Sequence, residues 1–138
     1  MSKLVRLTFT IEEALNRKME KLLKKGRFTN RSEFIRDLIR SRMVESEWEK
    51  DSDALGTITL VYDHDQRQLS DRLTSIQHQH HHEVLATTHV HLDNHLCAEM
   101  IMVKGRAKMI RDMADTMGQQ KGVLHSSLSM SSTGKQLK

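Results

Sequence analysis

The chain has 138 residues, 37% of them hydrophobic and 29% charged, which suits a soluble protein of one ordinary domain or two small ones. It holds neither an apolar stretch near the ~20 residues of a membrane span nor an N-terminal secretory run, and its single cysteine excludes an intrachain disulfide, so a cytoplasmic protein with no membrane partner is expected. The net charge of +4 is uneven: residues 1–50 hold 13 Lys and Arg against 8 Asp and Glu, whereas residues 51–138 hold 9 against 10, which indicates a polyanion partner for the first part.

Residues 4–11 alternate between apolar and polar side chains, which predicts a half-buried β-strand. The polar face of this strand consists of Arg6, Thr8 and Thr10. Thr10 is also expected to cap a helix that opens with Glu12 and Glu13 and stops at Gly26.

A second helix is predicted after Asn30, because Asn30 and Glu33 have the spacing of an N-terminal capping box. A single short strand cannot stand alone, and a strand-helix-helix unit of this size buries too little apolar surface to be stable. We therefore expect two copies to pair their strands across a dimer axis and to close one core between four helices. Residues 44–56 are acidic and polar, which predicts that the second helix frays there into a linker.

The expected two-stranded ribbon would display the polar strand face twice, at a size that fits the DNA major groove. Arginine can bridge a guanine, and threonine can contact base edges. The N-terminus of the second helix, at Asn30, Arg31 and Ser32, offers backbone N–H groups to a phosphate. An ordinary solvated edge strand is the alternative, but the strand-helix-helix order and the basic bias favour DNA.

The rest of the chain predicts a βαββαβ order, which is typical of a ferredoxin-like fold. The expected strands are 57–62, 84–92, 96–103 and 122–129, and the expected helices are 67–79 and 106–117. The methionines of the second helix are expected in the core. The predicted organisation is a DNA-binding domain at 1–50, a metal-binding domain at 51–130 and a disordered polar tail at 131–138.

The strongest chemical signal is a cluster of histidines, since seven of the nine lie between residues 78 and 95. His89 and His91 are two residues apart, so on a strand both rings leave the same face. A turn at residues 93–95 would bring Cys97 alongside them. Two imidazoles and one thiolate bind a soft or borderline transition metal, and the run from His78 to His82 can complete the set, from the same chain or a partner. Solvated surface histidines and a buried structural cysteine are the plainer alternative.

The chain resembles the nickel-responsive transcriptional regulators (NikR) over nearly its whole length. The motifs that carry the resemblance are Arg6-x-Thr8-x-Thr10, Asn30-Arg31-Ser32-Glu33, Gln77-His78 with the run to His82, and His89-x-His91-x5-Cys97. The resemblance implies an α+β chain, in which a ribbon-helix-helix (βαα) domain precedes a ferredoxin-like, ACT-like βαββαβ domain that forms the centre of a homotetramer, a dimer of dimers.

The resemblance also implies one Ni²⁺ per subunit in a square-planar set, with His89, His91 and Cys97 from one subunit and His78 from its neighbour. Such a geometry suits nickel(II) or copper(II) better than zinc. It further implies a palindromic double-stranded DNA operator, bound when nickel is present, and repression of nickel uptake.

Two further sites are implied by the same resemblance. Glu33 and Asp37, one helical turn apart, are expected to help hold a second cation, such as K⁺, between domains. Arg67 is expected to approach the DNA backbone, and this chain has Gln66 where some relatives have a second basic residue.

Two other functions compete with a metal-dependent repressor. A metal storage or chaperone protein could bind nickel, copper or zinc through its histidine cluster, but the Arg6-Thr8-Thr10 face would then be unexplained. A metalloenzyme using a histidine as acid or base ranks last, because a fully ligated site leaves no open position. The sequence therefore predicts a regulator rather than an enzyme.

Overall fold

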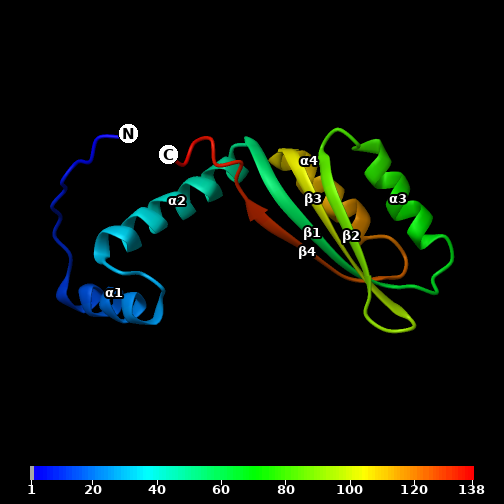
Figure 1. The fold of residues 1–138 in the computed structure, drawn as a ribbon, viewed down its shortest axis with the longest axis horizontal. Coiled ribbons are helices and arrows are strands. Elements are labelled where there is room, and N and C mark those ends of the chain that lie inside the picture. The colour runs from blue at the N-terminus through cyan, green and yellow to red at the C-terminus, as the bar shows by residue number, and fades with distance from the viewer. Residues whose placement is uncertain (1) are drawn as a thin grey trace. The chain divides into compact units, whose positions relative to one another are not determined.

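The structure is a computed structural model that describes residues 2–138, and the chain divides into two compact units, Met1–Ile39 and Arg40–Lys138. The helix α1 (Glu13–Lys25) lies in the first unit, and the helix α2 (Arg31–Glu49) begins there and continues into the second, as Figure 1 shows along the chain. Among the described residues, no helix is long and apolar enough to cross a membrane.

The ends of the two N-terminal helices follow the predicted signals, except at one cap. The backbone N–H of Gly26 donates to the Leu22 carbonyl at 2.8 Å and ends α1, as predicted. The Oδ1 atom of Asn30 accepts from the backbone N–H of Glu33 at 2.9 Å, which confirms that half of the capping box. The prediction that Thr10 caps α1 is wrong, because the N-cap position falls on Glu12 and Thr10 precedes it by two residues.

The predicted strand at residues 4–11 has no regular secondary structure in the single chain. A β-ladder needs two strands, and the chain offers this segment no second strand. Its apolar face is therefore uncovered, with Val5 74% and Leu7 81% exposed and Phe9 also exposed. These side chains are the ones that a partner strand and its helices would have to bury.

The predicted linker at residues 44–56 is wrong over most of its length, because α2 continues to Glu49 and the next strand begins at Asp53. Trp48 explains the difference: it is 3% exposed and belongs to the hydrophobic core of the second unit. Its Nε1 donates to the Ser131 carbonyl at 2.8 Å, and the guanidinium carbon of Arg111 lies 5.6 Å from its ring centroid. A large buried aromatic with a satisfied N–H stabilises the helix where composition alone indicated fraying.

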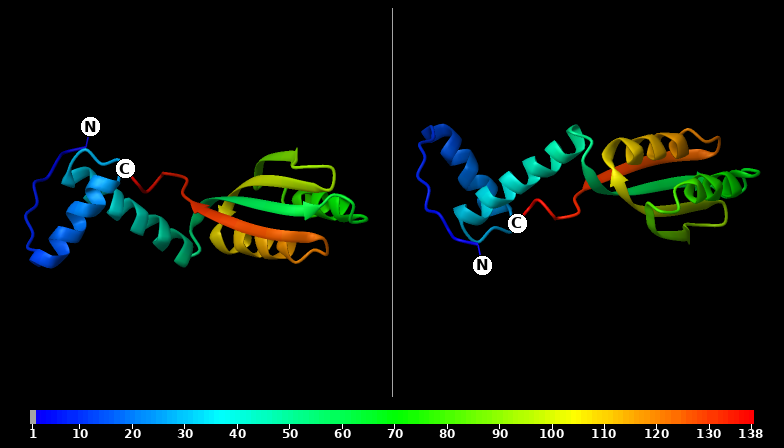
Figure 2. Two further views of the ribbon diagram at one scale, coloured as in Figure 1. Left: turned by 90° about the horizontal axis from the view of Figure 1, so that it is seen from below. Right: turned by 90° about the horizontal axis from the view of Figure 1, so that it is seen from above.

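The second unit is a four-stranded antiparallel sheet with two helices, in the predicted βαββαβ order. Its elements are β1 (Asp53–Asp63), α3 (Leu69–Gln79), β2 (Val84–His91), β3 (Leu96–Arg106), α4 (Ala107–Gly118) and β4 (Val123–Ser131). The strand order β2-β3-β1-β4 is that of a ferredoxin-like fold, and Figure 2 shows α4 lying along the sheet.

The core of the second unit lies between the helices and one face of the sheet. Alternate residues of β1 are buried, and they pack with Leu69 and Leu73 of α3 and with Met113 and Met117 of α4. The methionines of α4 are therefore core residues, as predicted. The other sheet face is open in the single chain, where Met100 of β3 is 44% exposed.

Candidate metal centre

The hairpin of β2 and β3 positions three of the predicted metal ligands. Across this pair His91 lies opposite Cys97, and His89 lies opposite Glu99, so all four side chains leave the same face. The predicted turn at residues 93–95 is present. The Oδ1 atom of Asp93 accepts from the backbone N–H groups of His95 at 2.7 Å and Leu96 at 2.8 Å, and these two bonds lower the pKa of Asp93.

A histidine that the sequence motifs do not include joins this hairpin. His64 follows β1, and its Nδ1 lies 3.3 Å from the Cys97 Sγ, the same distance as the His91 Nδ1. The rings of His64 and His91 stand nearly perpendicular, with centroids 5.1 Å apart. Donor atoms of His64, His91 and Cys97 all lie within 4.8 Å of one another, the one such group of three among the described residues.

The chemistry of Cys97 fits a metal ligand. Its side chain is a fully buried free thiol, and burial raises the pKa of that thiol, with nearby acidic groups adding to the effect. A transition metal binds the thiolate, so metal binding must displace the thiol proton. One buried sulfur beside two imidazole nitrogens is a donor set that suits nickel, copper or zinc.

The predicted sheet topology could have indicated His64, although this residue lies outside the histidine cluster. In a βαββαβ sheet the first and third strands are antiparallel neighbours, so the end of β1 meets the start of β3. The register places Tyr62 opposite Cys97, and His64 is two residues beyond Tyr62. His64 lies outside the 78–95 cluster, so proximity along the chain does not indicate it.

His89 lies next to the three-donor group without joining it in the single chain. Its ring centroid is 5.1 Å from that of His91 and 6.0 Å from that of the buried Tyr62. The side chain is exposed and on the same sheet face as His91 and Cys97.

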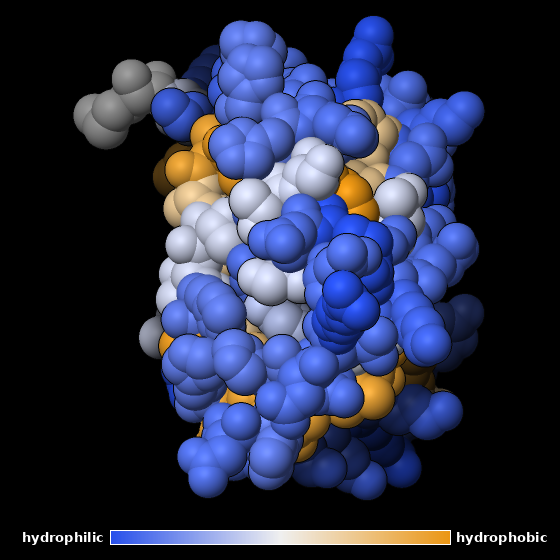
Figure 3. Space-filling view, turned by 90° about the vertical axis from the view of Figure 1, so that its right-hand side faces the viewer, coloured by the Kyte–Doolittle hydropathy of each residue, from blue (hydrophilic) through white to orange (hydrophobic). Residues whose placement is uncertain are grey.

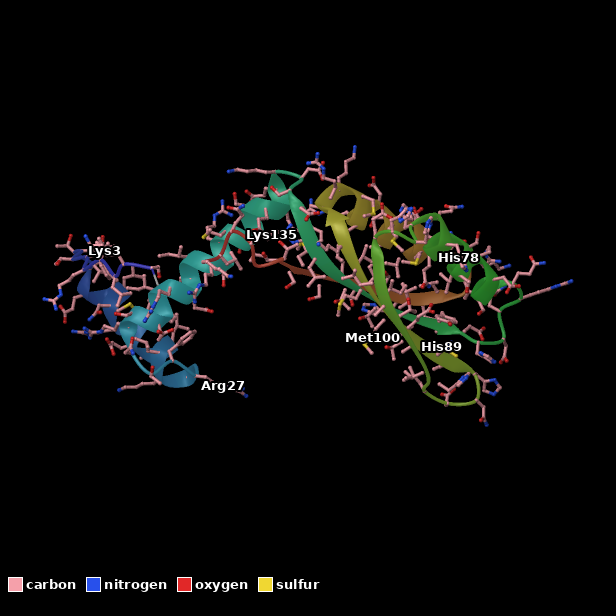
Figure 4. All side chains as sticks on the ribbon, turned by 45° about the horizontal axis from the view of Figure 1, so that its top comes forward. Lys3, Arg27, His78, His89, Met100 and Lys135 are labelled. Atoms are coloured by element: carbon pink, nitrogen blue, oxygen red, sulfur yellow. The ribbon has the colours of Figure 1, made fainter. Side chains whose placement is uncertain are left out.

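His78 does not meet the other donors in the single chain. It lies on the last turn of α3, exposed, beside Thr74 and His81, whereas His89 lies on β2 (Figure 4). The end of α3 is tied to β2, because the Thr87 hydroxyl donates to the Gln77 side-chain carbonyl at 2.8 Å. Figure 3 shows the side of the second unit on which α3 lies, and hydrophilic residues cover most of that face.

The loop after β1 is tied to the hairpin turn by three contacts. The backbone N–H of His64 donates to the His95 carbonyl at 2.7 Å, and the His95 Nδ1 lies 2.6 Å from the Asp65 carboxylate, which raises the pKa of His95. The third contact is that of His64 with Cys97. Arg67 is exposed on this same loop, and so the candidate metal centre and the predicted phosphate contact share one short segment.

Gln66, the neighbour of Arg67, packs closely against Gly122. Gly122 has φ +99°, and a Cβ built there would lie 2.5 Å from the Gln66 side chain, which shows how closely the two pack. Gln66 is half-buried in this contact.

The predicted DNA contacts of the first unit lie at its surface. Arg6, Thr8, Thr10 and Ser32 are exposed, while Arg31 forms an ion pair with Glu20 of α1. The predicted second-cation residues lie on α2, where Asp37 is exposed and the Glu33 carboxylate is paired with Arg36. That pairing satisfies Glu33 in the described chain.

Both units match known families. A family described as the NikR C terminal nickel binding domain matches residues 55–131, and a ribbon-helix-helix family, copG type, matches residues 5–45.

Relatives match over the whole chain. Two that are named as nickel-responsive regulators are 45% identical: one from Desulfotalea psychrophila covers 97% of this chain and 98% of its own length, and one from Geobacter sulfurreducens covers 99% of each. The solved structure of an uncharacterized protein, TM1266 from Thermotoga maritima, covers 57% of this chain and 98% of its own, with a TM-score of 0.52 and 14% identity, and supports the fold alone.

These similarities decide the class of protein. The matched domains join a nickel-binding module to a ribbon-helix-helix module, and the family consists of transcriptional regulators rather than enzymes, which excludes the metalloenzyme alternative. The chain belongs to the NikR family of nickel-responsive regulators.

Proposed function

We propose that this protein is a nickel-dependent repressor that binds a palindromic operator when nickel is bound and thereby limits nickel uptake. The observation that carries the proposal is the convergence of a buried thiol and imidazoles at the β2–β3 hairpin, in a chain that also holds a ribbon-helix-helix module. Storage alone would leave that second module without a role.

The proposed nickel ligands are His89, His91 and Cys97 of one subunit and His78 of its neighbour, one nickel per subunit. The first three share one sheet face, which supports their common role. His78 is exposed and lies outside the three-donor group of its own chain, as a residue that serves a second subunit would. His64 then supports the Cys97 sulfur rather than replacing His89.

The proposed DNA surface is the paired N-terminal strands of a dimer, with Arg6, Thr8 and Thr10 in the major groove. The exposure of Val5, Leu7 and Phe9 in the single chain supports dimerisation, since burying them removes a large apolar surface from water. Asn30, Arg31 and Ser32 are proposed to hold a phosphate at the N-terminus of α2.

The proposed assembly is a cytoplasmic homotetramer, a dimer of dimers, in which residues 1–50 bind DNA and residues 51–130 bind nickel and hold the subunits together. The open sheet face supports a subunit interface there. A second cation, such as K⁺, is proposed at Glu33 and Asp37, and it would have to displace Arg36 from Glu33.

We propose that nickel binding affects the DNA contact at Arg67 through the loop after β1. Metal at Cys97 restrains the hairpin, and the hairpin holds the loop through His64, His95 and Asp65. A restrained loop loses less conformational entropy when Arg67 meets a phosphate, so nickel and DNA bind with positive linkage.

Selection of DNA from a random duplex library tests the proposal directly, because it finds any sequence that the protein prefers. With one equivalent of nickel, the protein should enrich a palindromic sequence, and the variant Arg6→Ala should bind nickel but enrich none. If nickel binds tightly and no sequence is enriched by the wild type, the protein stores or carries metal instead.

A further inference from the structure

One carboxyl group near the metal centre is buried and incompletely satisfied. The side chain of Glu99 on β3 is 8% exposed, and its Oε2 has no hydrogen-bond partner among the residues that the structure describes. Burying a polar atom without a hydrogen bond costs free energy, so such an atom in a native fold needs an explanation. The Oε2 atom of Glu99 is therefore free to accept a hydrogen bond from a nearby side chain.

The sheet register identifies that partner. Glu99 lies on a central strand, opposite Leu60 on β1 and opposite His89 on β2, and its same-face neighbours along β3 are Cys97 and Ile101. Of the two residues directly opposite, His89 alone carries an N–H donor on its side chain. Cβ atoms of such opposed residues lie about 4.5–5.5 Å apart, which brings a glutamate carboxyl within reach of an imidazole.

Tyr62 lies near both His89 and Glu99. It is buried, its ring centroid lies 6.0 Å from that of His89, and the charge of Glu99 is one of the causes, after burial, that raise the pKa of Tyr62 to about 12. Tyr62, His89 and Glu99 therefore lie near one another on this face of the sheet.

We propose that Glu99 is a positioning residue, which accepts a hydrogen bond from the ring N–H of His89 and so orients that imidazole as a nickel ligand. The inference rests on the proposed function, in which His89 binds nickel. When one ring nitrogen binds a metal the other carries a proton, and an acceptor for that proton fixes the ring and its tautomer. The unpaired Oε2 of Glu99 is such an acceptor.

This role has two opposite consequences for the protein with and without metal. Without nickel the unpaired Oε2 of Glu99 destabilises the fold, so replacing Glu99 by leucine should not lower stability. With nickel the same group supports a ligand, so removing it should weaken metal binding. If Glu99 had only a structural role, replacing it would lower the stability of the metal-free protein and the nickel affinity together.

The test compares Glu99→Leu, Glu99→Gln and the control Glu47→Gln in the full-length protein. Glu47 is matched because its Oε2 is also buried without a partner among the described residues, but it lies on α2, away from the hairpin. Nickel affinity is measured by competition with a chelator, and the thermal midpoint of each protein is measured without metal.

Glu99→Leu should bind nickel about 10- to 100-fold more weakly while still forming the thiolate-to-nickel absorption band at saturation. Glu99→Gln, which keeps an acceptor oxygen, should lie between Glu99→Leu and wild type, and Glu47→Gln should match wild type. The thermal midpoint of metal-free Glu99→Leu should not fall below that of wild type.

Unchanged nickel affinity in Glu99→Leu overturns the inference, as does an affinity loss that accompanies a lower thermal midpoint or that Glu47→Gln shares. A wild-type protein that binds no nickel would instead overturn the proposed function.

Discussion

The Sγ of Cys97 lies 3.3 Å from the Nδ1 of His64, although 33 positions separate the two residues in the chain. The contact joins the end of β1 to the start of β3, so the candidate metal centre draws on the three strands β1, β2 and β3 and not on the β2–β3 hairpin alone. It also connects the centre with the loop that carries Arg67.

Replacing Cys97 by alanine should abolish high-affinity nickel binding while the fold is kept. Cys97 supplies the only thiol of the chain, and nickel bound to a thiolate absorbs in the near ultraviolet through charge transfer. Absorbance titration and circular dichroism measure the two quantities. Persistence of the band and of its stoichiometry in the variant would show that Cys97 is not a ligand.

Alanine variants of His64 and His89 separate the two possible donor sets. We expect His89→Ala to lose tight nickel binding, and His64→Ala to keep the absorption band with weaker affinity, because His64 supports the sulfur. The opposite pattern would make the ligand set that of the single chain, His64, His91 and Cys97. Nickel titration of both variants against a competing chelator measures the difference.

His78 should act across subunits. His78→Ala and His89→Ala each lack one ligand, so neither binds nickel tightly alone, but mixed assemblies would contain some complete sites. Subunit exchange followed by absorbance titration measures the recovery, and native mass spectrometry verifies mixing. Verified mixed assemblies without recovery would place all the ligands in one chain.

Trp48→Ala should destabilise the second unit by about 3–5 kcal/mol, the usual cost of removing a buried aromatic side chain. Trp48→Phe keeps most of the packing and loses the bond to the Ser131 carbonyl, so it should cost about 1 kcal/mol. Urea unfolding followed by circular dichroism measures both. Equal stability of wild type and Trp48→Ala would mean that α2 ends as the composition suggested.

Much of the second unit could be predicted from sequence because its periodicity is local. The β-rich run at 57–62, the turn at residues 93–95 and the inward methionines of α4 each depend on neighbouring residues. The extension of α2 could not be predicted, since Trp48 is held by Ser131 and Arg111, more than 60 residues away. His64 was missed for the same reason, because its partner is distant in the chain.

The N-terminal strand could not be confirmed in the single chain for a different reason. Its alternation is clear in the sequence, but one chain cannot form a ladder, and residues 2–12 have no regular structure by themselves. The pattern therefore predicts a property of two chains, which the single chain does not display.

The most direct test of the account is DNA affinity with and without nickel, measured by fluorescence anisotropy on the selected palindrome at constant salt. One equivalent of nickel should tighten DNA binding of the wild type, and DNA should tighten nickel binding by the same factor. Cys97→Ala should bind this DNA equally with and without nickel. Equal DNA affinity of the wild type in both conditions, with nickel shown to be bound, would contradict the account.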